Sequence, residues 1–371
     1  MIWNLPEISF CDTDTENVEK EIFNAYESAT GRTLYPGNPE TLFLKTLAYI
    51  IAQQRVLINY SAKMNLLAYA ESDYLDHLGI LLGVERLEAQ PATCTIRFEI
   101  NEALSFDVTI PQNTRVSPDG NLMFKTKTEA KITAGNTYVD VEAECETAGE
   151  IGNGYVPGQI NRLIDPVAYI TKAENITTSE NGSDTESDDN FRERIHIAPE
   201  SFSVAGPELA YVFYAKSAHQ DIIDVAVWSP SPGQVNIAPL MKNGELPSSE
   251  MLSLVEEAVN DENVRPLTDQ VNIQSPSQVN YNVLATYYIL KEYSGMVSEI
   301  QNSVNDAVNE YLSWQRTKLG RDINPAVLVN YIQNITGVKR VEVSEPVYQA
   351  LNAWEVAKED TVTITYGGLE D

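Results

Sequence analysis

Residues 39–70 read PETLFLKTLAYIIAQQRVLINYSAKMNLLAYA, a stretch with no Gly and no Pro after its first residue. Large apolar side chains recur in it at alternating steps of four and three, the spacing of one face of an α-helix. A helix of about thirty residues is about 45 Å long, more than a small domain covers. The stretch therefore predicts a long helix that needs a partner. Its apolar stripe is Phe43, Leu47, Ile50, Leu57, Met64 and Ala68, with Gln54 and Ser61 in the two polar gaps.

A second helix is predicted directly after this stretch. Ser72 is a good N-cap candidate, and Gly83 is a natural stop for a helix. We expect the two helices to pair as one helical hairpin in an N-terminal domain, residues 1–91. The apolar face of the second helix would be Leu75, Leu78, Leu81 and Leu82.

The pattern changes to period two after Pro91. Apolar and polar residues alternate in Cys94–Ile100 and again in Tyr138–Ala143, as they do in half-buried strands. Turn sequences at 118–120 and 135–136 separate these short strands. We therefore predict an all-β domain over residues 92–178.

The rest of the chain alternates predicted helices with predicted strands. An acidic, polar loop over 179–190 leads into a helix that begins near Asp189. Further helices are predicted from Pro207 and Pro325, with strands between them. These elements form two α+β domains, residues 179–275 and 276–371. The predicted fold class is multidomain α+β: an N-terminal helical hairpin, a central all-β domain and C-terminal α+β domains.

The charge balance excludes several kinds of partner. The chain has 25 Lys and Arg against 54 Asp and Glu, a formal net charge of −29. Nucleic acids and anionic membranes attract proteins through basic residues, so we expect no nucleic acid partner and no membrane insertion. The longest apolar run, over residues 42–52, is interrupted by Lys45 and is too short for a membrane span. Three widely spaced cysteines predict reduced thiols in a cytoplasmic setting.

The sequence contains no constellation that indicates catalysis. The three histidines are isolated from one another, and GxSxG and P-loop motifs are absent. Residues 184–195 resemble the start of an EF-hand loop, but Asp189 stands where that loop needs Gly and Ile195 where it needs Glu. We therefore expect no enzyme, and no catalytic residue, cofactor or metal ligand. A solvated acidic loop is favoured over a calcium site.

Four groups of turn and cap signals follow one another along the chain. They are ESDYLDHLGILLGVER at 71–86; IPQNTR at 110–115 with ITAG at 132–135 and AGEIGN at 148–153; NGSDTESDDNFRERI at 181–195; and Trp314 with LG at 319–320, INP at 323–325 and ITGV at 335–338. In this order they resemble the baseplate J-like family of contractile phage tails and related contractile injection particles. The family usually has two glycines before the acidic run, where this chain has Asn181 and Gly182. Asn tolerates positive φ, so we expect the turn to persist.

The resemblance implies a structural role. Such proteins are wedge components of the baseplate that form a ring around the tube and link baseplate assembly to sheath contraction. The implied partners are other wedge proteins, the sheath initiator and copies of the chain itself, as a dimer within a sixfold ring. Assembly would occur in the bacterial cytoplasm. The alternative is a carbohydrate-active or carbohydrate-binding tail protein with a site on the β-rich domain.

Two sites of partner contact are expected. Trp354, in a polar connection over residues 346–360, would be a contact anchor, or else a lid over the local C-terminal core. The second site is the seam of a helical bundle, unless this stripe packs on the second helix of its own domain. The seam residues would be Phe43, Leu47, Ile50, Leu57 and Met64.

Acidic faces would keep subunits soluble and steer them toward more basic neighbours.

Overall fold

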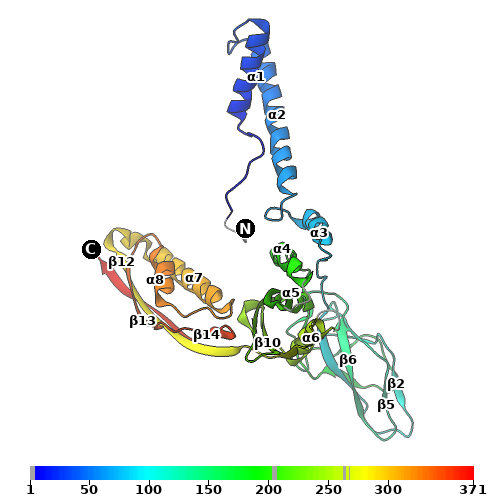
Figure 1. Ribbon diagram of the computed structural model, residues 1–371. Helices are drawn as coiled ribbons and strands as arrows, with labels where there is room; N and C mark the ends of the chain where they lie inside the picture. Colours follow the sequence, from blue (N-terminus) through cyan, green and yellow to red (C-terminus); the bar gives the residue numbers. More distant parts are fainter. Residues whose placement is uncertain (1–4, 203–206, 262–264, 267) are drawn as a thin grey trace. The chain divides into compact units, whose positions relative to one another are not determined.

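The computed structural model describes residues 5–202, 207–261, 265–266 and 268–371. The chain divides into two compact units, residues 1–86 with 187–196, and residues 87–186 with 197–371. The first unit is built from helices, and the second from sheets with helices packed on two of them (Figure 1). The predicted multidomain α+β fold class is confirmed.

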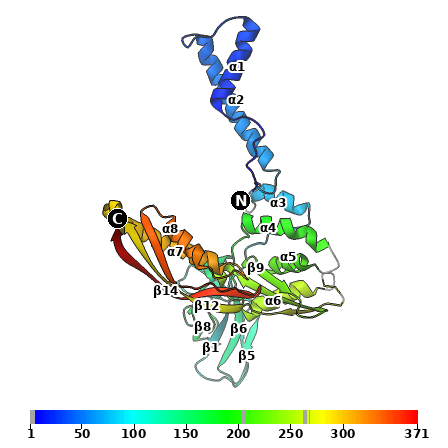
Figure 2. The same cartoon turned by 60° about the vertical axis from the view of Figure 1, so that its left-hand side comes forward.

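Helices α1 (Thr15–Thr30) and α2 (Pro39–Lys63) lie side by side as a hairpin in the first unit (Figures 1 and 2). Asp14 begins α1 by accepting hydrogen bonds from the amides of Glu16 and Asn17, at 2.8 and 3.3 Å. The contact between the helices uses small side chains of α2, with Ala48 and Ala52 packed against Val18. The partner of α2 is therefore α1, and the prediction that it pairs with the helix beginning at Ser72 is wrong.

Helix α2 ends at Lys63, earlier than the end near Ala70 that the sequence predicts. The Asn65 side chain donates to the carbonyl of Ser61 at 2.8 Å, a local bond that competes with further helix. Arg192 then donates to the carbonyls of Leu67 and Ala70, at 2.9 and 2.8 Å. Arg192 thus holds the non-helical segment that follows Lys63.

Helices α3 (Ser72–Ile80) and α4 (Asp188–Ile197) approach each other closely in the same unit. A Cβ atom at Gly79 would lie 2.6 Å from the ring of Phe191, so only glycine permits this contact. Ser72 is the first residue of α3 and not its N-cap, and its amide donates to Asp188 of α4 at 3.0 Å. The sequence places α4 at the start of a domain over 179–275, whereas the structure groups residues 187–196 with the first unit.

The second unit begins with the β-rich domain. Its main sheet has the order β7-β3-β4-β6-β1-β8, and β2 pairs with β5. Side chains of β1 alternate between buried and half-buried positions, which confirms the period of two seen in the sequence. The core contains Phe98 and Phe124, both completely buried. The elements are β1 (Thr93–Glu99), β2 (Val108–Ile110), β3 (Arg115–Ser117), β4 (Phe124–Thr126), β5 (Ala130–Ile132), β6 (Tyr138–Cys145), β7 (Arg162–Leu163), β8 (Lys172–Asn175) and a 3₁₀ turn, η1 (Glu150–Gly152).

The middle part of this unit is a three-stranded sheet of order β11-β10-β9 with two helices. Strand β10 pairs antiparallel with β9 and parallel with β11. Ser248 caps α6, accepting from the amide of Met251 at 3.2 Å. The elements are η2 (Ala198–Phe202), α5 (Glu208–Ala218), β9 (Ile222–Trp228), β10 (Gln234–Met241), η3 (Lys242–Gly244), α6 (Ser249–Asn260) and β11 (Gln270–Ile273).

The C-terminal part is a sheet of order β13-β12-β14 that packs against α7 and α8. The central strand β12 pairs antiparallel with β13 and parallel with β14. Strand β14 begins at Glu355, so the polar connection expected over 346–360 is shorter than predicted. The elements are β12 (Ser277–Leu290), η4 (Lys291–Met296), α7 (Val297–Arg316), α8 (Pro325–Gln333), β13 (Val338–Glu345) and β14 (Glu355–Glu370).

Candidate functional site: the outward face of helix α2

One side of α2 is used inside the hairpin. Thr41, Leu44, Ala48 and Ala52 recur at steps of three and four and are buried. Ion pairs reinforce this side, because Lys45 meets Glu19 of α1 at 3.0 Å and Arg55 meets Glu21 at 2.7 Å. The charged side chains near the middle of α2 are therefore engaged by α1.

The predicted seam lies on another side of α2 and faces away from this contact. Phe43 is 69% exposed, Leu47 37%, Ile50 50% and Leu57 56%. These four do not pack on α3, so the alternative that they fill their own domain's core is wrong. Met64 differs, since it lies beyond the helix end and is 5% exposed. Burial in its own fold removes Met64 from the seam.

A second exposed row runs beside the seam, and the sequence reasoning missed it. Leu42, Tyr49, Val56 and Tyr60 are all exposed and follow one another at steps of seven, seven and four. One residue along a helix corresponds to a rotation of about 100°, so this row lies roughly a quarter turn from the seam. The sequence signal for this row is the heptad step that joins Leu42, Tyr49 and Val56, which the predicted stripe does not include.

The two rows carry no charge along the length of α2. Four polar but uncharged residues lie on this surface. Gln54 and Ser61 belong to the seam, and Thr46 and Gln53 lie between the two rows. The apolar side chains on this surface are large, and a solvated helix normally shows charged residues there. An exposed apolar patch of this kind marks a surface that another protein covers.

Trp354 makes an internal contact. Its ring stacks on Trp228 of β9 with centroids 4.8 Å apart and planes 25° from parallel. The stacked pair packs against Leu240 and Val356, which are buried. This packing favours the alternative that Trp354 covers a local core, while a contact of Trp354 with a partner stays a prediction.

The acidic run 181–195 also serves the fold. Asn181 has φ 68°, which confirms that Asn takes the turn conformation expected there. Asp184 accepts from the amide of Glu150 at 3.0 Å, and buried Glu186 accepts from the amide of Leu87 at 3.1 Å. The expected solvated loop is thus wrong at Glu186, because its carboxylate satisfies a backbone donor inside the protein.

The R-x-R pair at the end of this run is buried in the first unit. Arg194 donates to the carbonyl of Glu85 at 2.6 Å, while Arg192 holds the residues that follow α2. Arg86 forms an ion pair with Asp188 at 2.8 Å and lies over the ring of Phe191. The R-x-R motif therefore holds α4 against the residues around α3 through hydrogen bonds, and the ion pair of Arg86 with Asp188 reinforces this contact.

The described residues form cavities but no metal-binding cluster and no membrane-spanning helix. None of their His, Cys, Asp and Glu side chains gather into a group that could hold a metal ion. None of the helices in the described part combines the length and the apolar character that a membrane span requires. Two cavities of about 860 and 410 Å³ occur in the second unit, and among the described residues no Trp, Tyr or Phe lines either one. These two cavities thus lack the aromatic lining common in small-molecule sites.

Comparison with known proteins returns one family along most of the chain. Four of its domain models match in order: the Baseplate J-like N-terminal domain at 37–93, the barrel domain at 95–182, the central domain at 203–275 and the C-terminal domain at 281–365. Baseplate protein J of Escherichia phage P2 is 34% identical over 205 residues. That match covers 54% of this chain and 66% of the phage protein. A chain in the cryo-EM structure of the anti-feeding prophage baseplate, sixfold symmetrised, is 12% identical with a TM-score of 0.46, covering 93% of this chain and 90% of that one.

Proposed function

Because the chain belongs to the baseplate J-like family, we propose that it is a structural subunit of the baseplate of a contractile tail or a related injection particle. Its work is to hold neighbouring subunits, and α2 is the element that binds one of them. The observation that carries this proposal is the exposed, uncharged surface formed by the two apolar rows of α2.

The physical argument concerns buried area. Completely burying one Leu, Ile or Phe side chain contributes about 1.5–3 kcal/mol relative to leaving it in water. The hairpin itself leaves Phe43, Ile50 and Leu57 at least half exposed. A helical partner that packs on both rows recovers this free energy. Gln54 and Ser61 within the seam would fix the register of such a bundle, as single polar residues do in coiled coils.

The finer role follows the family. The subunit would form part of a ring around the tube and would link baseplate assembly to sheath contraction. Its partners would be other wedge proteins, the sheath initiator and copies of itself, as a dimer within a sixfold ring. It would assemble in the bacterial cytoplasm and then remain in the baseplate of the particle. The fold described above supports this role only through its family and the exposed α2 surface.

The test is assembly with the products of the neighbouring tail genes, followed by native mass spectrometry. The wild-type chain should give a stoichiometric complex. The triple variant Phe43→Gln, Ile50→Gln, Leu57→Gln keeps good helix formers and the same charge but removes the seam. It should weaken the complex by about a hundredfold or more, since three buried apolar contacts are lost.

A matched control removes equally exposed apolar residues elsewhere: Ile151→Gln, Val156→Gln and Val347→Gln. This control should assemble like the wild type. Wild-type affinity in the seam variant would contradict the assignment of α2 as the binding element. Failure of the wild-type chain to join any neighbouring tail protein would contradict the proposed function itself.

A further inference from the structure

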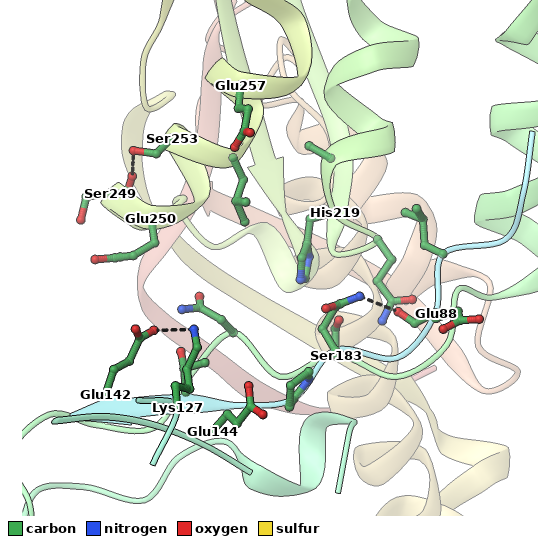
Figure 3. Close-up of a pocket in the computed structure, with 18 residues that line it drawn as sticks. Glu88, Lys127, Glu142, Glu144, Ser183, His219, Ser249, Glu250, Ser253 and Glu257 are labelled. Carbon is green, nitrogen blue, oxygen red and sulfur yellow. Dashed lines mark hydrogen bonds and ion pairs between the residues drawn. The ribbon is translucent and has the colours of Figure 1, made fainter. Parts of the chain in front are cut away.

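The larger cavity of the second unit lies between the β-rich domain and helix α6 (Figure 3). Its volume of about 860 Å³ is within the range of ligand sites in proteins. One wall is the outward face of α6, where Glu250, Ser253 and Glu257 line the cavity. The opposite wall carries Lys127 and Glu142 of the β-rich domain. The cavity is an open groove, and no residue of α2 lines it.

The groove has more negative charge than its own residues neutralise. Lys127 pairs with Glu142 at 2.9 Å, and Glu144 pairs with Lys125 at 3.2 Å. Among the described residues, by contrast, Glu88, Glu250 and Glu257 form no ion pair with Lys or Arg. Hydrogen bonds at the start of α6 hold the pKa of Glu250 below its usual range, so this carboxylate is charged at neutral pH. Glu250 and Glu257 are two helical turns apart on α6, about 10 Å.

The groove also contains a buried donor without an acceptor. His219 is 6% exposed, and Figure 3 shows its ring pointing toward Ser183. Its Nδ1 atom accepts from the amide of Asp221 at 3.2 Å, so the proton of the neutral ring is on Nε2. Within the described residues, neither Nε2 of His219 nor Oγ of the fully buried Ser183 has a hydrogen-bond partner. Leaving such groups unpaired is costly, which indicates a site awaiting a polar ligand.

Burial keeps the ring of His219 neutral. Burial lowers the pKa of His219, and the nearby carboxylate of Asp221 opposes this shift. Burial raises the pKa of Asp221, Lys242 opposes this shift, and Glu150 and Asp184 add to it. A neutral ring donates one hydrogen bond through Nε2 and needs an acceptor such as a carbonyl oxygen. The groove thus presents a hydrogen-bond donor at its base and unmatched carboxylates along its rim.

We propose that this groove binds an extended, basic segment of a partner protein. A backbone carbonyl of the segment accepts from Nε2 of His219, and its Lys or Arg side chains pair with Glu250, Glu257 and Glu88. The spacing suits a polypeptide, because three residues of extended chain span about 10 Å. The net charge of −29 disfavours a second copy of this chain, so the segment comes from a different, more basic subunit.

The experiment measures binding of a labelled peptide to the full chain by fluorescence anisotropy near physiological ionic strength. The probe is a peptide of about twelve residues that alternates Lys and Thr, long enough to extend through the groove. The wild-type chain should bind it, and a peptide with Glu in place of Lys should not bind. The variant Glu250→Gln, Glu257→Gln should bind the Lys peptide about tenfold more weakly, because two ion pairs are lost.

The control Glu299→Gln, Glu310→Gln removes the same charge from exposed positions of α7 outside the groove. It should stay within about twofold of the wild type, since its charges are distant and screened. If both variants bind the peptide equally weakly, the peptide is attracted by the net negative charge of the chain and not by the groove, and the proposal is overturned. Displacement of the peptide by an equal charge concentration of spermine would also overturn it, because the site would then bind small cations. These outcomes leave the α2 seam untouched and so test the groove separately.

Discussion

The β-rich domain buries its large apolar side chains, whereas the α1–α2 hairpin leaves several of its own exposed. In the β-rich domain large side chains such as Phe98, Phe124 and Ile96 are completely buried by their own sheet. In the hairpin the buried contact is made by Val18, Ala48 and Ala52, while Phe43 and Ile50 of α2 face outward. The first region completes its core alone. The second keeps its large apolar side chains on the surface, where a partner can bury them.

The largest effect is expected from truncating one large side chain in each region. Phe124→Ala leaves a cavity in the closed β-rich core and should lower the free energy of unfolding by about 3–5 kcal/mol. Phe43→Ala removes a side chain that is mostly in water and should change it by less than about 0.5 kcal/mol. Urea unfolding of the full chain, followed by circular dichroism, measures both. Equal losses for the two variants would mean that α2 already has its partner within the chain.

Thiol reactivity offers a second comparison of the two regions. Burial, with a smaller contribution from Cys145, raises the pKa of the Cys94 thiol to about 12. Burial also raises the pKa of Cys145 itself, whereas Cys11 beside α2 is partly exposed. At pH 8 a thiol reagent should modify Cys11 first, with the other two at least about a hundredfold slower. All three should react together in guanidinium, and fast labelling of Cys94 in the native chain would show that the β-rich core opens readily.

A smaller effect is expected at the start of the hairpin. Asp14→Ala removes the side chain that accepts from the amides of Glu16 and Asn17. Loss of such an N-cap costs about 1 kcal/mol, so the hairpin should melt at lower temperature while the β-rich domain is unaffected. Asp14→Asn restores an accepting oxygen and should recover most of the loss. Circular dichroism at 222 nm measures the change, and a loss that Asn does not recover would indicate that charge, not capping, matters at this position.

Local periodicity was sufficient for much of the fold. The alternation in Cys94–Ile100 predicted a strand with one buried face, and Pro325 predicted the start of α8. Both features depend on neighbours in the sequence. The exposed seam at Phe43 and Ile50 was also identified in this way, because a helix longer than its local cover must present apolar residues outward.

Contacts between distant residues account for what the sequence did not reveal. Nothing local indicates that Arg192 binds the carbonyls of Leu67 and Ala70, in the segment that follows the end of α2. The stacking of Trp354 on Trp228 likewise joins residues that lie far apart in the chain. The groove beside His219 is formed by residues of the β-rich domain and of the part that contains α6, so no local sequence motif predicts it. Such features become visible only when the chain is folded.

The central claim is that α2 is completed by a partner, and amide hydrogen exchange tests it most directly. Exchange should be measured over residues 43–61 of α2 and over strands β1 and β6, in the free chain and in the assembled baseplate. The α2 amides should exchange about tenfold or more slowly after assembly, because a covered helix opens less often, while the strands change little. Exchange of α2 that is the same in the free and assembled states would contradict the claim.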